Sequence, residues 1–323
     1  MGHLGRHHAR IYSEIPEASL VGVYDVDENK AQKIASQFNT KAFDDLDSLL
    51  DRTEAVSLVV PTSLHFEVGR IILERGLDLL IEKPITQTKE QAQILVSLAQ
   101  EKNSILQIGH IERFNPAFRA VEKDVHEPKF IESHRLSSFA PRGTDVAVIL
   151  DLMIHDIDLI LSLVKSEVEK IEASGVPVIT DSEDIANARI TFKNGCVANV
   201  TASRISKSPM RKFRIFQKNS YISLDLMERK AEVFKLIDME KTERDYSKVT
   251  SIVGQIPLDA KKTIIYLKPE IKDEDMLCSE IKSFLHAVSN KAEPEVTGED
   301  GRRALEVALE IQKVAELHRQ RSR

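Results

Sequence analysis

Apolar and polar positions follow two patterns along this chain, and the first covers roughly residues 1–114. Short, almost continuously apolar runs alternate there with amphipathic helical segments. The predicted strands are 19–25, 55–61, 77–82 and 104–110, and the predicted helices are 5–14, 28–38, 65–75 and 89–102. Apolar strands that alternate with helices are typical of a parallel sheet covered on both faces. We therefore predict a doubly wound α/β domain, 1–114.

The pattern changes near residue 115, where strands with alternating polar and apolar residues replace the apolar runs. Such alternation indicates antiparallel strands with one solvated or partner-covered face. Helices are predicted at about 150–164, 274–289 and 300–319. We predict a second, α+β domain over 115–323 with a mainly antiparallel sheet. Its last helix, about 299–319, is a candidate to pack back on the first domain.

Composition and charge narrow the class of protein. The chain has 323 residues, 42% hydrophobic and 30% charged, with a formal net charge of −6. Without a basic excess, nucleic acid is not an expected partner. No apolar run reaches the ~18 residues of a membrane helix. The two cysteines, Cys196 and Cys278, lie far apart and match no metal-ligand spacing, so we expect reduced thiols in a cytoplasmic protein and no metal site.

The first residues resemble a phosphate-binding turn. Gly2-His3-Leu4-Gly5 has the spacing of the last two glycines of G-x-G-x-x-G, in which a helix N-terminus meets a pyrophosphate. Asp25 ends the next predicted strand, twenty residues after Gly5, where an acid binds the adenosine ribose hydroxyls. An acid there repels a 2′-phosphate, so NAD is favoured over NADP. The alternatives are a glycine helix cap and an Asp25 that only begins a turn with Asp27.

A strand that should precede this turn is missing from the sequence. A doubly wound sheet without its first strand leaves the neighbouring strands unpaired and the turn unsupported. We therefore expect that the natural protein begins several residues earlier, and that Met1 is a displaced start. An intact mass of the native protein equal to that of this chain would contradict this expectation.

Three motifs together resemble one family. The glycine turn, Glu82-Lys83-Pro84 after a predicted strand, and the run DLMIHDID at 151–158 are similar to the Gfo/Idh/MocA oxidoreductases. The resemblance covers the chain except the missing strand. It implies a Rossmann-type NAD-binding domain, hydride transfer at a hydroxyl-bearing carbon, and Lys83 near nicotinamide and substrate. It also implies that Asp151 and His155 line the reaction centre, with the histidine as general base.

The chemistry of these side chains agrees with that implication. A lysine at the carboxyl end of a strand favours a developing alkoxide. On a helix, Asp151 and His155 at i and i+4 project from one face. The histidine can then take a hydroxyl proton, while the aspartate orients the substrate and influences the charge of the imidazole. The alternatives are that Lys83 is a surface lysine, that His155 is a core histidine, and that Asp151, His155 and Asp158 bind a metal. No fourth metal ligand follows from the spacing.

Other residues are weaker candidates. Thr62 and His65, after the strand at 55–61, are predicted to contact the nicotinamide ribose or pyrophosphate, although Thr62 or Ser63 can instead cap the following helix. Arg113 and Asn115 are predicted substrate or cofactor contacts, with domain packing as the alternative. The predicted cofactor residues are Gly2, His3, Leu4, Gly5, Asp25, Thr62, His65, Glu82 and Lys83.

The substrate class follows from the resemblance. Residues 138–161 are most similar to family members that oxidise C3 of UDP-linked amino sugars such as UDP-N-acetylglucosamine. Arg142 suits a diphosphate or a pair of sugar hydroxyls, or is a solvated arginine in a turn. The other hypotheses are a dehydrogenase of a free sugar, cyclitol or dihydrodiol, and a non-catalytic NAD-binding regulator. Family members are commonly homodimers or homotetramers, and the second sheet offers a face for such contacts.

Overall fold

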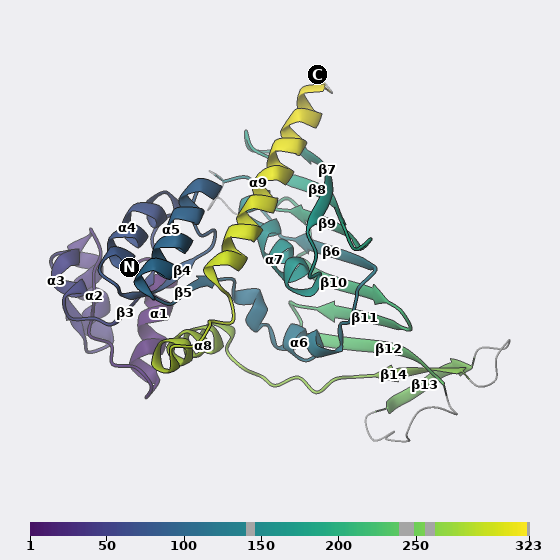
Figure 1. The fold of residues 1–323 in the computed structure, drawn as a ribbon, viewed down its shortest axis with the longest axis horizontal. Helices are drawn as coiled ribbons and strands as arrows, with labels where there is room; N and C mark the ends of the chain where they lie inside the picture. The colour runs from purple at the N-terminus through teal and green to yellow at the C-terminus, as the bar shows by residue number, and fades with distance from the viewer. Residues whose placement is uncertain (140–145, 239–248, 256–261, 322–323) are drawn as a thin grey trace. The chain divides into compact units, whose positions relative to one another are not determined.

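The structure is a computed structural model, which describes residues 1–139, 146–238, 249–255 and 262–321. Contacts divide the chain into two compact units (Figure 1). The first comprises 1–114 and 274–306, and the second comprises 115–273 and 307–323. Residues 274–306, which the sequence analysis assigned to the second domain, thus belong to the first unit.

The first unit contains five parallel strands and their helices. Its elements are α1 (His3–Glu14), β1 (Gly22–Val23), α2 (Glu28–Gln37), β2 (Lys41–Ala42), α3 (Leu46–Leu50), β3 (Ala55–Leu58), α4 (Thr62–Glu74), β4 (Asp78–Glu82), α5 (Lys89–Lys102), β5 (Leu106–Gly109), η1 (Ile111–Phe114), α8 (Met276–Asn290) and the start of α9 (Gly298–Arg321). β1 pairs with β2, and β3, β4 and β5 form a second sheet in that order, all parallel. No hydrogen-bonded pair joins the two sheets in the described residues, so the parallel sheet of this unit is in two pieces.

Apolar burial explains why α8 joins the first unit although it lies far along the chain. Leu277, Ile281 and Phe284 of α8 form one buried cluster with Ile11 and Leu80. The first turns of α9 approach β5 closely at Gly301, where an added Cβ would lie 2.5 Å from Ile108. The first turns of α9, up to Glu306, accordingly belong to the first unit.

The second unit is built on one nine-stranded sheet. Its strands are β6 (Phe130–Leu136), β7 (Val168–Val176), β8 (Ile185–Phe192), β9 (Val197–Ser203), β10 (Met210–Gln217), β11 (Ser220–Asp225), β12 (Lys230–Asp238), β13 (Val249–Gln255) and β14 (Lys262–Leu267). The order is β13-β14-β12-β11-β10-β6-β9-β8-β7, and among the described strands of this sheet only β6 and β9 pair in parallel. The helical segments are α6 (Pro116–Arg119), η2 (Glu122–Asp124), η3 (Ile149–Met153), α7 (Ile154–Leu163) and the rest of α9.

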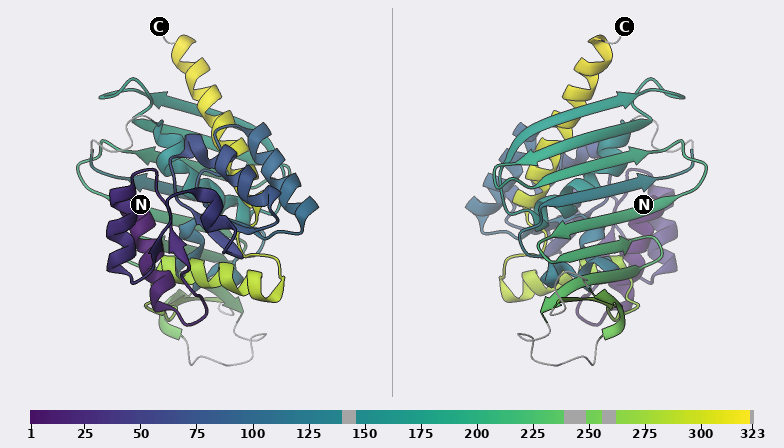
Figure 2. Two further views of the ribbon diagram at one scale, coloured as in Figure 1. Left: turned by 90° about the vertical axis from the view of Figure 1, so that its left-hand side faces the viewer. Right: turned by 90° about the vertical axis from the view of Figure 1, so that its right-hand side faces the viewer.

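Alternation along these strands separates a buried face from an outer face. Ile131, Ile215 and Ile222 are fully buried, on the face packed against α7. Figure 2 (right) looks onto the other face. A row of five aromatic rings crosses that face on neighbouring strands: Phe130, Phe216, Tyr221, Phe234 and Tyr266. Successive ring centroids are 5.6, 4.8, 5.6 and 5.1 Å apart.

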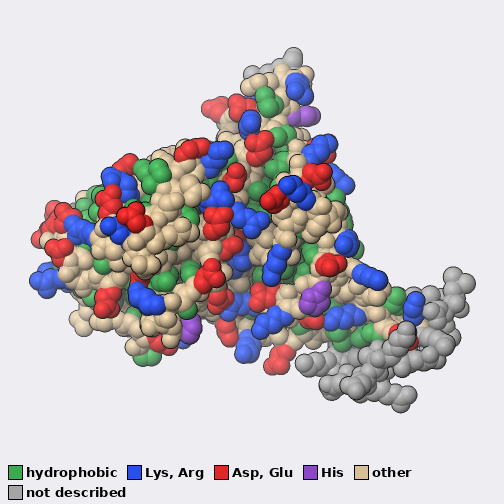
Figure 3. Space-filling view, in the orientation of Figure 1, with side chains coloured by type: hydrophobic (Ala, Val, Ile, Leu, Met, Phe, Trp, Pro, Cys, Tyr) green, Lys and Arg blue, Asp and Glu red, His purple; other side chains and the backbone are tan. Residues whose placement is uncertain are grey.

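The surface carries both signs of charge. On the face shown in Figure 3, acidic and basic side chains are interspersed. Over the described part of the chain, no helix is both long enough and apolar enough to cross a membrane.

Candidate active site

In the first unit, the carboxyl ends of three parallel strands place predicted site residues along one edge. β3 leads into Thr62, β4 ends at Glu82 and continues to Lys83, and β5 ends at Gly109. In open α/β sheets ligands bind outside the carboxyl ends of the strands. The architecture of this unit therefore brings Thr62 and Lys83 to the edge where a cofactor is expected.

Two helices of the first unit, α1 and α4, begin at predicted cofactor-binding motifs and lack a side-chain cap at their N-termini. Asp27, Asp45, Thr88 and Asp275 cap α2, α3, α5 and α8. At α1 and α4 no side chain accepts a hydrogen bond from the first turn. The predicted Thr62 or Ser63 cap is wrong, because α4 begins at Thr62 and its N-cap is Pro61. Uncapped N–H groups at a helix start are the donors that a dinucleotide phosphate requires, so this unit fits such a cofactor.

The predicted glycine turn forms the start of α1. Gly2 is its N-cap, His3 and Leu4 are its first two residues and are exposed, and Gly5 is buried. An added Cβ at Gly2 would meet nothing within 4 Å, which leaves open space at this helix start. The positions of Gly2, His3 and Leu4 are therefore compatible with a bound phosphate, and their role stays a prediction.

Asp25 follows β1 by two residues and is half-buried. Its carboxylate accepts the Asp27 N–H at 2.8 Å and pairs with the amino group of Met1. The local turn that was the alternative for Asp25 is thus present. The turn uses Oδ1, and the amino group of Met1 pairs with Oδ2, so the ribose contact of Asp25 stays a prediction.

Glu82 and Lys83 stand at the end of β4. Lys83 is half-buried, and the Lys83–Pro84 peptide bond is cis. Glu82 Oε1 lies 3.1 Å from His8 Nε2, and an added Cβ at Gly109 would be 3.0 Å from the Glu82 carboxyl. The turn that carries Lys83 is therefore closely packed.

His65 is 1% exposed and lies in the first turns of α4. Its Nδ1 is 2.9 Å from the carbonyl oxygen of Pro84, and its Nε2 is 2.9 Å from that of Val60. Burial lowers the pKa of His65, and the two carbonyl contacts oppose that effect only in part. The structure thus places both ring nitrogens against the backbone. The predicted cofactor contact of His65 has no support in this arrangement.

In the second unit, Asp151 and His155 lie on consecutive but different helical segments. Asp151 belongs to the π-helical η3, where the N–H of Ile154 reaches the carbonyl of Ile149, five residues back. His155 belongs to α7, and both side chains are half-buried. The predicted regular α-helical spacing therefore holds only from Ile154 onward. Single π turns inside helices are frequent at functional sites.

A buried ion pair that sequence reasoning missed holds α7 next to His155. Arg135 of β6 donates from Nε to Asp156 Oδ2 at 3.1 Å and from Nη2 to Asp156 Oδ1 at 2.8 Å. Both side chains are at most 4% exposed. The signal was available, because Arg135 has the inward parity of Ile131 and Ser133 on its strand. A charged residue at an inward position needs a buried partner.

The remaining predicted contacts have different outcomes. Asn115 is fully buried, caps α6 by accepting the Ala117 N–H at 3.1 Å, and donates to the Leu226 carbonyl at 2.9 Å. Its side chain is thus used in packing, the alternative to a substrate contact. Arg113 Nη2 lies 3.7 Å from Asp300 Oδ1, and its role stays a prediction. Arg142 lies outside the described residues.

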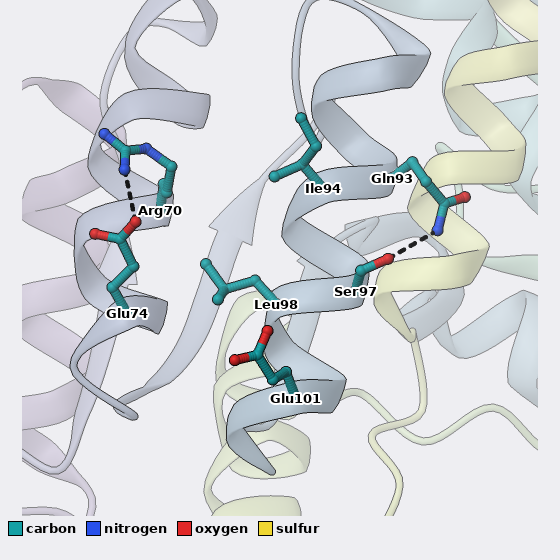
Figure 4. Close-up of a pocket in the computed structure, with 7 residues that line it drawn as sticks. All are labelled: Arg70, Glu74, Gln93, Ile94, Ser97, Leu98 and Glu101. Atoms are coloured by element: carbon teal, nitrogen blue, oxygen red, sulfur yellow. Dashed lines mark hydrogen bonds and ion pairs between the residues drawn. The ribbon is translucent and has the colours of Figure 1, made fainter.

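Two other arrangements do not add to the site. Within the described ranges, no three His, Cys, Asp or Glu side chains are grouped so that they could hold a metal ion. A groove on the outer side of the first unit lies between α4 and α5, and Ile94 and Leu98 point into it (Figure 4). Its lining residues include none of the predicted site residues.

A parallel α/β unit with uncapped helix starts at its ligand-binding edge, joined to a unit with a large open sheet, is compatible with a two-domain nucleotide-dependent oxidoreductase. Comparison with family models is specific. Residues 1–110 match the oxidoreductase family with an NAD-binding Rossmann fold, and residues 108–222 match the GFO/IDH/MocA C-terminal domain. The chain belongs to the Gfo/Idh/MocA oxidoreductase family. It is an enzyme of this oxidoreductase family, and the predicted family and fold class are confirmed.

Individual relatives agree with this assignment. The chain is 37% identical over 322 residues to UDP-N-acetylglucosamine 3-dehydrogenase of Acidithiobacillus ferrooxidans, covering 99% of this chain and 97% of the relative. A solved structure of that enzyme superposes with a TM-score of 0.87, covering 98% of this chain and 95% of the other. Scyllo-inositol 2-dehydrogenase (NAD(+)) of Bacillus subtilis is 27% identical over 64% of this chain and 66% of the relative.

Proposed function

We propose that this chain is an NAD-dependent dehydrogenase that oxidises the C3 hydroxyl of a UDP-linked amino sugar. The observation that carries the proposal is the 37% identity along 99% of the chain to UDP-N-acetylglucosamine 3-dehydrogenase. Oxidation of a cyclitol is the second candidate. It is supported by the inositol dehydrogenase relative, at lower identity and over a smaller share of the chain.

The cofactor proposal uses residues of the first unit only. The open N–H groups at the starts of α1 and α4 would bind the phosphates, and Asp25 would accept hydrogen bonds from the adenosine ribose. The negative charge of Asp25 is the reason to favour NAD over NADP, because it repels a 2′-phosphate. Nicotinamide, when bound, supplies the group that accepts a hydride.

The chemical proposal assigns a role to three side chains on one substrate. The imidazole of His155 takes the proton from the sugar hydroxyl. The ammonium group of Lys83 stabilises the negative charge that develops on that oxygen. Asp151 orients the sugar and favours the protonated imidazole. Support comes from the family membership and from the motifs that carry Lys83, Asp151 and His155.

We also propose that the enzyme is a homo-oligomer, a dimer or a tetramer, formed through the outer face of the nine-stranded sheet. The aromatic row supports this, because Phe216, between Phe130 and Tyr221 in the row of five adjoining rings, is 37% exposed. Exposed, contiguous aromatic surface is uncommon on monomers and frequent at interfaces.

The experiment measures formation of NADH or NADPH by absorbance from UDP-N-acetylglucosamine, UDP-glucose and scyllo-inositol, each with NAD⁺ and with NADP⁺. We expect turnover on the UDP-amino sugar with NAD⁺, and a product two mass units lighter. In Lys83→Met, kcat should fall by roughly 10²–10³, because one charge-stabilising donor is lost. Lys89→Met, an exposed lysine at the start of α5, is the matched control and should leave kcat unchanged.

Two results would count against the proposal. Turnover of scyllo-inositol without turnover of the nucleotide sugar would favour the second candidate. Normal kcat in Lys83→Met would remove the assigned role of the lysine.

A further inference from the structure

The two residues that flank Lys83 are each held by a buried histidine. His8 Nε2 lies 3.1 Å from Glu82 Oε1, and His65 Nδ1 lies 2.9 Å from the carbonyl oxygen of Pro84. The histidines come from different helices, α1 and α4, and are 3% and 1% exposed. The turn at the end of β4 is thus in contact with a buried histidine on each side of Lys83.

The contacts of His65 are with the backbone alone. Pro84 and Val60 each offer a carbonyl oxygen, which can only accept a hydrogen bond, so the neutral ring donates to Pro84 in the tautomer whose proton is on Nδ1 while Nε2 stays packed against Val60. His65 therefore links the loop after β3 to the turn after β4, at the edge where parallel strands present their ligand-binding residues. A buried ring with both nitrogens against the main chain acts on the geometry of these loops and has no nitrogen left for a cofactor.

The contact of His8 is with a side chain that has little freedom. The Glu82 carboxyl faces Gly109 of β5, where an added Cβ would lie 3.0 Å away. Glu280 of α8 is fully buried and faces Glu82, so two carboxyl groups share this interior. The ring of His8 lies 3.1 Å from Glu82 Oε1 in this crowded interior, within hydrogen-bond distance.

We propose that His8 and His65 are positioning residues that fix the backbone on either side of Lys83 and so fix its ammonium group in the position required for hydride transfer. This inference rests on the proposed function, in which Lys83 stabilises the reacting oxygen. It departs from the sequence-based expectation that His65 touches the cofactor.

The test exploits the fact that the two histidines use different ring nitrogens toward the turn. The amide nitrogen of asparagine occupies the place of Nδ1, and that of glutamine occupies the place of Nε2. At position 65 we therefore expect His65→Asn to keep the contact with Pro84 and His65→Gln to lose it. At position 8 we expect the reverse, with His8→Gln functional and His8→Asn impaired.

Two readouts are measured on each full-length variant, with thermal melting to verify folding. In His65→Gln and His8→Asn, kcat should fall roughly 10- to 100-fold, because a small displacement of a reacting group is costly. The Kd for NADH, from titration of NADH fluorescence, should stay within about twofold, because only the lysine turn is changed. Hydrogen exchange followed by mass spectrometry should become faster over residues 82–86. His286→Asn, an exposed histidine of α8, is the control.

The outcomes separate this inference from the proposed function. If the wild type turns over no nucleotide sugar, the proposed function fails, and the exchange of residues 82–86 still decides whether the histidines hold the turn. Unchanged exchange and kcat in His65→Gln and His8→Asn would overturn the inference. A large rise in the Kd for NADH with unchanged kcat would also overturn it, by making His65 a cofactor ligand. Function retained in His65→Asn and His8→Gln, together with impaired function in His65→Gln and His8→Asn, would support the inference.

Discussion

At the scale of single residues, the first unit contains an acid in an unfavourable place. Glu280 is fully buried, and neither carboxyl oxygen has a hydrogen-bond partner within the described ranges. Burial, together with the nearby Glu82, raises the pKa of Glu280 well above its ordinary value. The side chain lies on the apolar face of α8 with Leu277, Ile281 and Phe284. The folded protein therefore holds Glu280 as the neutral acid over a wide pH range.

This predicts a dependence of stability on pH. Between the ordinary glutamate pKa and the raised folded value, the folded protein binds a proton that the unfolded chain has lost. The free energy of unfolding contributed by Glu280 is therefore largest at low pH and decreases as pH rises through this range. Glu280→Gln does not titrate, so its stability relative to wild type should increase from about pH 5 to about pH 8. Urea denaturation at both pH values measures this difference.

The outcome that contradicts this prediction is a difference in stability between Glu280→Gln and wild type that does not change with pH. Exposed Glu101→Gln on α5 is the control and should follow the wild type.

At the scale of elements, α7 is attached to its sheet by charge as well as by apolar packing. The Arg135–Asp156 pair joins β6 to α7 with two hydrogen bonds and is at most 4% exposed at either side chain. Asp156 follows His155 directly, so the pair fixes the turn of α7 that presents the proposed base. The π-helical η3 before it carries Asp151.

Removing one partner of the Arg135–Asp156 pair should lower the free energy of unfolding strongly, whereas removing both partners should lower it little. Arg135→Met leaves an uncompensated buried carboxylate, and we expect a loss of about 3 kcal/mol in the free energy of unfolding. The double variant Arg135→Met, Asp156→Leu should recover most of that loss, because neither charge remains. Denaturant titration of the two variants and of Asp156→Leu completes the double-mutant cycle.

An additive cycle, in which the double variant loses the sum of both single losses, would show that the pair does not act as a unit. An unchanged kcat in the double variant would show that packing alone orients His155. A reduced kcat would show that the ion pair contributes.

At the scale of the whole molecule, the nine-stranded sheet leaves one broad face for partners. Five aromatic rings on adjoining strands cross it, and flanking ion pairs such as Arg214–Glu132, 2.7 Å apart, border the row. Burying such an aromatic surface against a second protein surface removes a large apolar area from water and stabilises the contact.

We predict that Phe216→Lys shifts the enzyme from a dimer or tetramer toward the monomer, because it buries an unpaired charge in the proposed interface. Sedimentation velocity at several protein concentrations measures the shift. Leu317→Lys, at an apolar residue of α9 that is 45% exposed, is the control and should keep the wild-type assembly. An unchanged sedimentation coefficient for Phe216→Lys would assign the assembly, if there is one, to another surface.

Some features of the fold and the site could be predicted from the sequence, and others could not. Periodicity identified the alternation of strands and helices in 1–114, because burial on both faces imposes apolar runs on parallel strands. In the second domain, alternation indicated antiparallel strands but not where each one turns, as at Asn219, which has a φ of 60° and lies in the hairpin between β10 and β11. The motif Glu82-Lys83-Pro84 was recognisable because its residues are consecutive.

The sequence by itself determined the family, the α/β class and the motifs that carry Lys83, Asp151 and His155, since these depend on local pattern and on neighbours along the chain. Only the tertiary structure decided that α8 packs on α1, that His8 meets Glu82 across 74 residues, and that Arg135 pairs with Asp156. It also decided that His65 faces two carbonyl groups. The physical reason is that a buried polar group takes whichever partner the fold brings near, and separation along the chain does not reveal that partner.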